Sequence, residues 1–302
     1  MNAAATTKNP RTGLLESTHD YYKVPLVRQR GLGRLRFDGQ MTAVHTAPFR
    51  EGMTLDFYAR LKRSDEIIVT FHGAGDLTKL TYPVFTRVKS LKQKAPAMMS
   101  FADPTMLLDP EHKMMLSWYL GGPGWDPLPT IINVIRKAMG KCGAKHIAFL
   151  GGSGGGFAAL RASAMVPGSM AFVQDPQVTI AKYSTRVVQT YFDTAWPGWS
   201  HRSLMNAFPE RFDMVRHYRT AQPRNFVYYA QNATDRSHIL KHYEPFLDAC
   251  GISGDDPVVR RQSRVFNRYD GEHSGHGKIT ASEFDRFYDD ALDGWRSFRP
   301  HF

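Results

Sequence analysis

The pattern most able to do chemistry in this sequence is a run of glycines around one serine. Residues 151–155 read Gly-Gly-Ser-Gly-Gly and fit G-x-S-x-G, with Ser153 at the centre. An apolar run, 146–150, comes directly before it, and an alanine-rich stretch, 157–166, follows it. Between a strand and a helix, this pattern holds a serine hydroxyl on a tight turn, where flanking glycines avoid a Cβ clash. We therefore predict that Ser153 is a nucleophile.

A nucleophilic serine needs a general base, and we expect that base in the loop before the C-terminal helix. In nucleophile-elbow enzymes the acid follows the serine and the histidine comes last. Residues 269–278 form this loop and contain two histidines. We favour His276, because the glycines on both sides of it leave the loop free to reach across to the serine. His273 is the alternative.

The base in turn needs an acid that orients it, and two aspartates follow predicted strands at suitable points. Asp235 comes five residues after the strand 225–230, and Asp175 directly follows the strand 170–174. We take Asp235 as the acid and keep Asp175 as the alternative. As ordinary structural residues, Asp175 would end a strand in a turn and Asp235 would cap a helix.

An oxyanion hole requires two backbone N–H groups aimed at one point. We expect the first from Gly154, the residue after the nucleophile. The second should come from the loop after the strand 66–71, where residues 72–75 read His-Gly-Ala-Gly and resemble the HGGG-type loop of esterases. We favour the amide of Ala74, with Gly73 as the alternative. Two parts of one catalytic apparatus thus fall on two strand ends in the expected order.

The elements that must position these groups alternate along the chain from about residue 50. Short apolar runs alternate with longer amphipathic stretches, which predicts a mostly parallel sheet with helices on both faces. We predict strands over 66–71, 97–101, 146–150, 170–174, 225–230 and 264–268. We predict helices over 83–94, around 131–138, over 157–166 and 237–250, and after a capping box formed by Thr280 and Glu283.

Residues 178–222 do not fit the alternation, and we predict that they form a helical lid insertion across the sheet rim. The segment is rich in aromatic residues and interrupted by Pro197 and Gly198. Aromatic rings suit either an acyl chain or a sugar ring. We therefore expect substrate-binding residues among Tyr183, Tyr191, Trp196 and Trp199. The alternative is that these rings form the insertion's own small core.

Length and composition indicate one large domain. The chain has 302 residues, of which 42% are hydrophobic and 12% aromatic, and this excludes disorder for most of it. We expect a flexible polar tail over 1–20 and one α/β domain over 21–302 that includes the insertion at about 178–222. No apolar stretch approaches the roughly 18 residues of a membrane span, and residues 1–20 lack the apolar run of a secretory signal. We expect a soluble, cytoplasmic protein.

The net charge of +11, from 39 Lys and Arg against 28 Asp and Glu, could favour acidic partners. No window carries five or six basic residues in a row, and no basic stripe interleaves with aromatic residues. We therefore predict a solvated basic surface without a specific nucleic-acid site. The two cysteines, Cys142 and Cys250, are too few for a disulfide framework or a four-thiolate metal site, which favours a reducing compartment.

From about residue 50 to residue 300 the chain resembles the α/β-hydrolase superfamily. Short pieces also look similar to the accessory Sec-system glycan O-acetyltransferases: 71–74 (FHGA), 102–105 (ADPT), 152–160 (GSGGGFAAL), 175–177 (DPQ) and 275–277 (GHG). The resemblance implies acyl transfer through an acyl-serine, to water or to a sugar hydroxyl. It implies a small-molecule or glycan ester as substrate and no cofactor. It also makes Asp103 a neighbour of the active site, where a strand-end turn would place it equally well.

Three other interpretations compete with a serine enzyme. Residues 154–159 also fit G-x-G-x-x-A, with Asp175 at the distance of a ribose-binding acid, although the first glycine lies too far beyond the strand for a dinucleotide fold. His238 and His242 have zinc-binding spacing, but Ile239 stands where a metalloprotease needs its Glu. We predict exposed helix histidines and no metal. A hydrolase fold could also serve as a non-catalytic binding protein.

Overall fold

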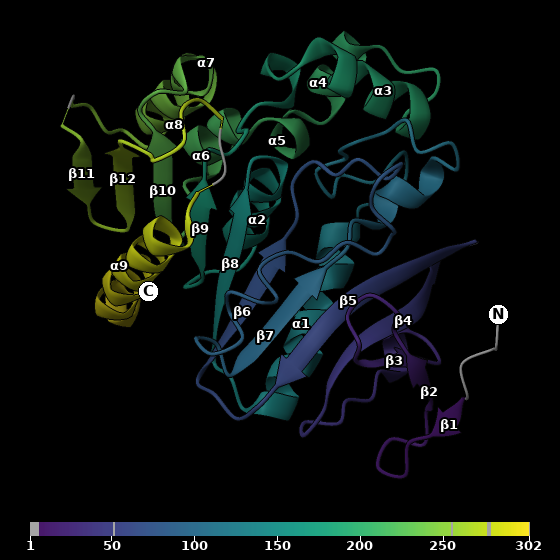
Figure 1. The fold of residues 1–302 in the computed structure, drawn as a ribbon. Helices are drawn as coiled ribbons and strands as arrows, with labels where there is room; N and C mark the ends of the chain where they lie inside the picture. Colours follow the sequence, from purple (N-terminus) through teal and green to yellow (C-terminus); the bar gives the residue numbers. More distant parts are fainter. Residues whose placement is uncertain (1–5, 51, 255, 277–278, 302) are drawn as a thin grey trace.

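The computed structural model describes residues 6–50, 52–254, 256–276 and 279–301, and its strands form one mixed sheet (Figure 1). The spatial order of the strands is β1-β2-β3-β4-β5-β7-β6-β8-β9-β10-β12-β11. The strands span Thr7–Lys8 (β1), Leu15–Thr18 (β2), Pro25–Arg28 (β3), Thr42–Arg50 (β4), Met53–Leu61 (β5), Glu66–Phe71 (β6), Ala97–Phe101 (β7), His146–Gly152 (β8), Met170–Gln174 (β9), Phe226–Asn232 (β10), Val258–Arg261 (β11) and Arg264–Tyr269 (β12).

Six neighbouring strands at the centre, β7-β6-β8-β9-β10-β12, run parallel, and antiparallel β5 and β11 flank them. Their apolar runs are nearly continuous because both faces of the central sheet are covered. The predicted mostly parallel sheet is confirmed. Since parallel strands end at one edge, the loops that follow β6, β8, β10 and β12 meet there.

Helices cover both faces of the sheet (Figure 1). On one face lie α1 (Pro127–Cys142) and α2 (Gly154–Ala164), and on the other lies α9 (Ala281–Phe298). The predicted capping box of Thr280 and Glu283 begins α9, and its apolar stripe is buried. A further helical segment consists of α7 (Arg236–His238), a π-helical turn (Ile239–Tyr243) and α8 (Glu244–Ala249).

The stretch 83–94, which the sequence predicts as a helix, is instead an irregular loop between β6 and β7. Its backbone bonds to side chains of the sheet: the Thr86 N–H donates to Ser100 Oγ, and the Thr86 carbonyl accepts from Thr70 Oγ1. Leu91 is still fully buried against the sheet. The apolar spacing therefore predicted correctly that this stretch packs on the sheet. Its backbone, however, forms hydrogen bonds to distant side chains in place of the hydrogen bonds of a helix.

The predicted flexible tail over 1–20 is wrong for residues 6–20. β1 pairs with β2, and β2 pairs with β3, which joins the sheet through β4. The Asn9 side chain accepts hydrogen bonds from two backbone N–H groups and so closes the turn between β1 and β2. Leu14 is buried in a small separate core. Residues 6–20 look like a polar tail in the sequence because the small core that they help to form contains few apolar residues.

The segment 178–222 is helical, as predicted, and follows β9 directly, so it lies at the carboxyl edge of the sheet (Figure 1). It contains a short 3-10 turn (Ile180–Lys182), α3 (Thr185–Ala195), α4 (His201–Ala207), α5 (Pro209–Phe212) and α6 (Met214–Ala221). That it acts as a lid stays a prediction.

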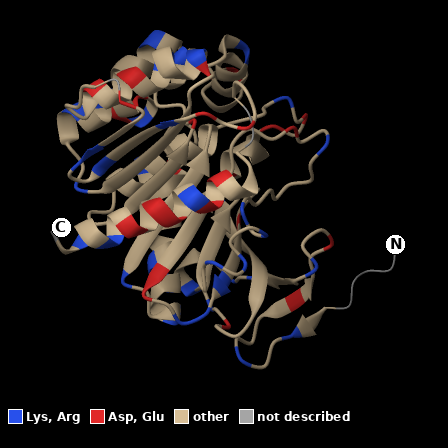
Figure 2. Cartoon of the chain, turned by 60° about the vertical axis from the view of Figure 1, so that its left-hand side comes forward, with Lys and Arg blue, Asp and Glu red and all other residues tan. Residues whose placement is uncertain are grey.

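Charged side chains of both signs are spread over several elements, and both signs lie along the exposed face of α9 (Figure 2). Arg260 pairs with Asp290 of α9, and Lys94 pairs with Asp285 of the same helix. Among the helices that the structure describes, none is both long and apolar enough to cross a membrane.

Two adjacent leucines test whether the N-terminal strands belong to the fold. Leu14 is 2% exposed and Leu15 is 51% exposed. We expect Leu14→Ala to lower the free energy of unfolding by about 2–3 kcal/mol, because it leaves a cavity in the small core, and Leu15→Ala to change it by less than about 0.5 kcal/mol. Urea unfolding of both variants measures the difference. Equal effects would mean that this segment adds no core.

Candidate active site

The candidate nucleophile occupies the turn between β8 and α2. Ser153 has φ 53° and ψ −123°, a strained conformation that costs a non-glycine residue about 1–3 kcal/mol. A Cβ on Gly151 would lie 2.1 Å from the Gly155 carbonyl oxygen, and one on Gly155 would lie 2.2 Å from the Phe71 carbonyl oxygen. Only glycine fits at both positions, so the pattern G-x-S-x-G here reflects a close crossing of helix and strands.

Three loops bring a serine, a histidine and an aspartate into one hydrogen-bonded line. Ser153 Oγ lies 3.0 Å from His276 Nε2, and His276 Nδ1 lies 3.0 Å from Asp235 Oδ2. Asp235 is buried and also caps α7 by accepting from the His238 N–H. With the serine hydroxyl donating to Nε2, the ring proton lies on Nδ1 and points at the carboxylate. Gly277, next to His276 in the sequence, lies outside the described residues.

The two alternative residues lie outside this line. The His273 side chain is exposed, and its backbone carbonyl accepts from the Asn232 side chain. Asp175 is buried and accepts from the Asn232 N–H at 2.7 Å and from the side chains of Gln231 and Gln174. Burial raises the pKa of Asp175. These bonds tie the end of β9 to the end of β10, which is a structural role.

A second histidine, which the sequence did not assign to the site, shares the same carboxylate. His238 Nδ1 lies 2.9 Å from Asp235 Oδ2, and its ring stacks on that of His276 with centroids 4.2 Å apart and planes 11° from parallel. Burial is the main cause that lowers the pKa of His238 to about 4, and the charge of the neighbouring His276 contributes to the same effect. His238 is therefore neutral at neutral pH, with its proton on Nδ1 donated to Asp235.

A glutamine closes the contacts into a ring. Gln177 Nε2 donates to Ser153 Oγ at 2.8 Å and lies 3.4 Å from His238 Nε2, which is the acceptor nitrogen of that ring. Its amide orientation is fixed because Trp118 Nε1 donates to Gln177 Oε1 at 3.1 Å. Gln177 is fully buried. Because the serine oxygen accepts from Gln177, the serine proton is left to face His276.

The prediction that His238 and His242 are exposed helix histidines is wrong. Their side chains are 7% and 1% exposed, and His242 Nδ1 accepts from the Val178 N–H. His238 of α7 packs against the ring of His276, and His242 of the following π-helical turn packs against His238. The spacing Asp235-x-x-His238 across the first helical turn is the signal that could have found the shared carboxylate.

Asp235, His238 and His276 each offer one ligand atom, and these atoms lie within 4.8 Å of one another. Both Nδ1 atoms donate to the carboxylate in the arrangement above. A divalent metal would have to displace both protons and would remove the orienting bond of His276. We assign these atoms to hydrogen bonding, and the absence of a cofactor stays a prediction.

The candidate oxyanion hole lies between the start of α2 and the loop after β6. Gly154 is the first residue of α2, so its N–H has no acceptor within the helix. A Cβ on Gly73 would lie 3.5 Å from Ser153 Cβ and 3.7 Å from the Gly154 nitrogen. Gly73 thus lies directly beside the serine, and Ala74 follows it and is exposed. Both remain candidates for the second donor.

Buried hydrogen bonds hold the loop that follows β6 in place. His72 Nε2 accepts from the Asp103 N–H at 3.2 Å, so its proton lies on Nδ1, which is 2.7 Å from the Gly73 carbonyl. Burial lowers the pKa of His72, which keeps the ring neutral. The Asp103 carboxylate accepts from Ser117 Oγ and the Tyr119 N–H. Asp103 therefore holds the loop through its backbone N–H, while its carboxylate is bonded to Ser117 and Tyr119.

The four aromatic residues predicted to bind substrate have different environments. Tyr191 and Trp196 are buried, and Trp196 Nε1 donates to the Tyr191 hydroxyl, so for these two the prediction is wrong; both rings belong to the main hydrophobic core. Trp199 is 38% exposed and packs edge-on against Trp196. Tyr183 packs edge-on against His238 and is the one of the four that contacts the ring of site residues.

Comparisons with solved structures agree on the fold. The chain is similar to the capsule O-acetyltransferase of Neisseria meningitidis serogroup A, with 15% identity, a TM-score of 0.57, and 95% of this chain and 98% of that one covered. It is also similar to an S-formylglutathione hydrolase from Agrobacterium tumefaciens, with 12% identity, a TM-score of 0.53, and 87% of this chain and 97% of that one covered. A further similar structure is carboxyl esterase 2 from Tuber melanosporum, with 15% identity, a TM-score of 0.50, and 86% of this chain and 85% of that one covered. No family model and no curated protein matches the sequence. The α/β-hydrolase fold predicted from the sequence is confirmed.

The shared carboxylate predicts a pH effect. His238→Phe keeps a stacked ring but removes the second donor to Asp235, so the carboxylate would stabilise protonated His276 more strongly. We expect the acid limb of kcat/KM for an ester substrate to move up by about 0.5–1 pH unit. His238→Asn is the matched control, because its amide N–H can replace Nδ1 and should leave the limb near its original place. Identical profiles for the two variants would contradict the shared-donor account.

Proposed function

We propose that this protein is a serine hydrolase of the esterase type that acts through an acyl-Ser153 intermediate. The observation that carries the proposal is the relay of two 3.0 Å contacts from Ser153 through His276 to Asp235. The fold shared with esterases and an acyltransferase supports it at a coarser level. The buried, correctly ordered acid and the strained serine turn are features that a nucleophile site requires.

In the proposed acylation step, Ser153 Oγ attacks the ester carbonyl carbon while His276 Nε2 takes the hydroxyl proton. Asp235 stabilises the imidazolium without accepting its proton. The Gly154 N–H and an amide of residues 73–74 would stabilise the negative oxygen of the tetrahedral intermediate. When this intermediate collapses, the alcohol leaves with the proton from His276. Water then repeats the sequence on the acyl-serine and releases the acid.

A second candidate is an O-acyltransferase to a sugar hydroxyl. The likeness to the capsule O-acetyltransferase over nearly the whole of both chains favours it, together with the sequence resemblance to glycan O-acetyltransferases. The same groups would act, and a sugar hydroxyl would replace water in the second step. The two candidates therefore differ only in which oxygen attacks the acyl-serine.

The dinucleotide interpretation is not proposed. The glycines that would cradle a pyrophosphate face protein: a Cβ on Gly154 would lie 2.4 Å from Leu116 Cδ1, and one on Gly156 would lie 2.6 Å from Pro176 Cβ. Side chains of the protein thus fill the space beside these two glycines that a dinucleotide fold would leave for a pyrophosphate. A non-catalytic binding role is separated from an enzyme by labelling Ser153 with a fluorophosphonate.

Replacement of the relay residues tests the mechanism. We expect Ser153→Ala and His276→Ala to lower kcat for 4-nitrophenyl esters by about 10³-fold or more, and Asp235→Asn to cost less than either. His273→Ala is the control and should stay within about twofold, because its side chain is exposed away from the relay. An active Ser153→Ala protein would overturn the scheme.

Asp175→Asn separates the structural acid from the catalytic one. The new amide would set N–H groups against the donors that surround Asp175, so we expect a loss of about 1.5–3 kcal/mol in the free energy of unfolding, measured in urea. We expect kcat of the folded variant to stay within about threefold. A severe loss of kcat with unchanged stability would instead place the catalytic acid at Asp175.

Partition of the acyl-enzyme separates hydrolase from transferase. With a 4-nitrophenyl ester and a sugar acceptor at increasing concentration, a transferase would form acyl-sugar at the expense of free acid, as measured by mass spectrometry. A hydrolase would give only the acid. Comparing esters of increasing chain length in the same assay measures the acyl preference.

A further inference from the structure

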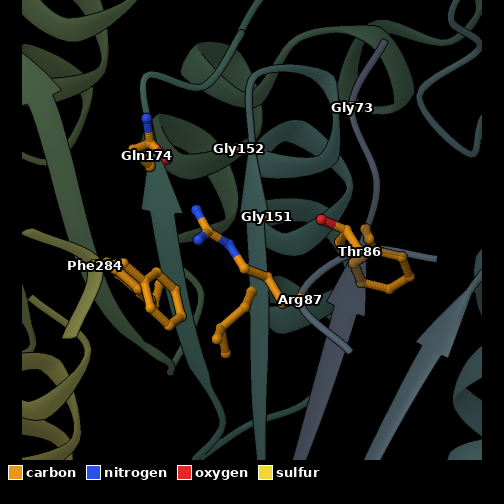
Figure 3. A pocket seen from close by; sticks show the side chains of 10 residues that line it. Gly73, Thr86, Arg87, Gly151, Gly152, Gln174 and Phe284 are labelled. Atoms are coloured by element: carbon orange, nitrogen blue, oxygen red, sulfur yellow. The ribbon is translucent and has the colours of Figure 1, made fainter. Parts of the chain in front are cut away.

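A cavity of about 130 Å³ lies beside the serine turn, on the α9 side of the sheet (Figure 3). Glycines form the wall nearest the reaction centre: Gly151 and Gly152 come directly before Ser153, and Gly73 belongs to the candidate oxyanion loop. A Cβ on Gly73 would lie 3.5 Å from Ser153 Cβ. The cavity therefore borders the backbone segments that carry and flank the serine. Its floor is apolar and includes Phe71 and Phe284.

Among the described residues that line this cavity, Arg87 is the cationic one. Arg87 comes from the loop between β6 and β7, and Figure 3 shows its guanidinium extending toward the space between Gly152 and Gln174. The guanidinium lies 4.0 Å from the ring centroid of Phe284. Burial lowers the pKa of Arg87 to about 10, so the group is still charged at neutral pH.

No residue in the described part of the chain forms a hydrogen bond or ion pair with the Arg87 guanidinium. The charged and titratable groups that face it are Asp285 and Tyr269. Asp285 pairs with Lys94 at 3.4 Å, and the Tyr269 hydroxyl donates to Asp175 at 3.3 Å. A guanidinium has five N–H donors, and leaving them unmatched in a partly buried place is costly. The cavity thus presents a charged donor group without an acceptor.

The position of Arg87 is built into the fold. Its φ of 60° is uncommon for a residue with a side chain, and such a conformation persists only where the surroundings hold it. The preceding residue, Thr86, is tied to the sheet through Ser100 and Thr70. The side chain is therefore directed into the cavity by the backbone, unlike an ordinary surface arginine.

We propose that this cavity binds a carboxylate that the ester substrate carries a few bonds from the bond that Ser153 attacks, with Arg87 as its partner. The inference rests on the proposed function and deepens it by naming the substrate class. A guanidinium fork matches a carboxylate, and the aromatic floor suits the short carbon chain that joins carboxylate to ester. A cavity of about 150 Å³ admits benzene, so one of about 130 Å³ has room for a short carbon chain. The carboxylate can belong to the acyl or to the alcohol part.

Matched ester pairs test the proposal and locate the charge. Phenyl hydrogen glutarate carries a carboxylate on the acyl side, with phenyl pentanoate as its neutral partner. 4-Acetoxybenzoate carries it on the alcohol side, with phenyl acetate as its neutral partner. After subtraction of the rate without enzyme, we expect one charged ester to exceed its partner in kcat/KM by about 10- to 100-fold, mainly through KM. Arg87→Gln should remove this preference and leave the neutral esters within about twofold.

Two further variants serve as controls. Arg87→Lys keeps the charge but loses the fork, and should retain part of the preference. Arg286→Gln removes an exposed arginine of α9 and should change nothing. Equal losses for charged and neutral esters in Arg87→Gln would mean that the side chain only supports the loop, and would overturn the proposal. No preference for either charged ester in the wild-type protein would overturn it as well.

A binding measurement separates this inference from the proposed function. Calorimetric titration of Ser153→Ala protein with phenyl hydrogen glutarate and 4-acetoxybenzoate requires no turnover. Binding of one of them that is lost in the Ser153→Ala/Arg87→Gln double variant supports the carboxylate site even if the wild-type protein hydrolyses no ester. Turnover of neutral esters without any binding that depends on Arg87 supports the hydrolase and overturns the carboxylate site.

Discussion

The contact on which the rest of the site depends is the close crossing between the first turn of α2 and the ends of β8 and β6. Glycine at 151 and 155 lets backbone meet backbone, since a Cβ at either position would lie within 2.2 Å of a carbonyl oxygen. This crossing forces the serine into its strained turn and leaves the Gly154 N–H at the start of a helix, where the positive end of the helix dipole lies. It also sets the loop after β6 beside the serine.

Three buried aspartates follow three of the parallel strands, and the groups around each one decide its role. Asp103 meets a hydroxyl and backbone N–H groups and holds the candidate oxyanion loop. Asp175 meets amide groups and the Tyr269 hydroxyl and ties two strands together. Asp235 alone meets imidazole rings. The three carboxylates are chemically alike, and burial requires each to be satisfied by hydrogen bonds, so their donors distinguish the two structural acids from the proposed catalytic one.

The surroundings of the serine are asymmetric. On one side, His276, Asp235, His238 and Gln177 form a ring of contacts in which His238 is neutral and every donor has an acceptor. On the α9 side, Arg87 borders a cavity, and none of the residues that the structure describes accepts a hydrogen bond from its guanidinium. Because His238 stays neutral, only His276 of the two stacked rings would become charged on taking the serine proton. On the other side, the fixed positive charge of Arg87 would attract a negative charge on the substrate. The basic excess of the whole chain, by contrast, is spread among acidic groups (Figure 2).

The sequence by itself determined the strands of the central sheet, the serine turn and the order of the groups after it. The alternation of apolar runs and the positions where only glycine avoids a steric clash are local properties, so a few neighbouring residues are enough to recognise them. Loop position was enough to place Asp235 and His276 ahead of Asp175 and His273, but only as expectations. The tertiary structure decided which distant side chains meet: Ser153 and His276 are 123 residues apart, and Gln177 and His238, which the sequence analysis did not assign to the site, contact the same group of residues. It also replaced the helix expected over 83–94 by a loop and buried Tyr191 and Trp196, because hydrogen bonds and packing between remote segments outweigh local periodicity.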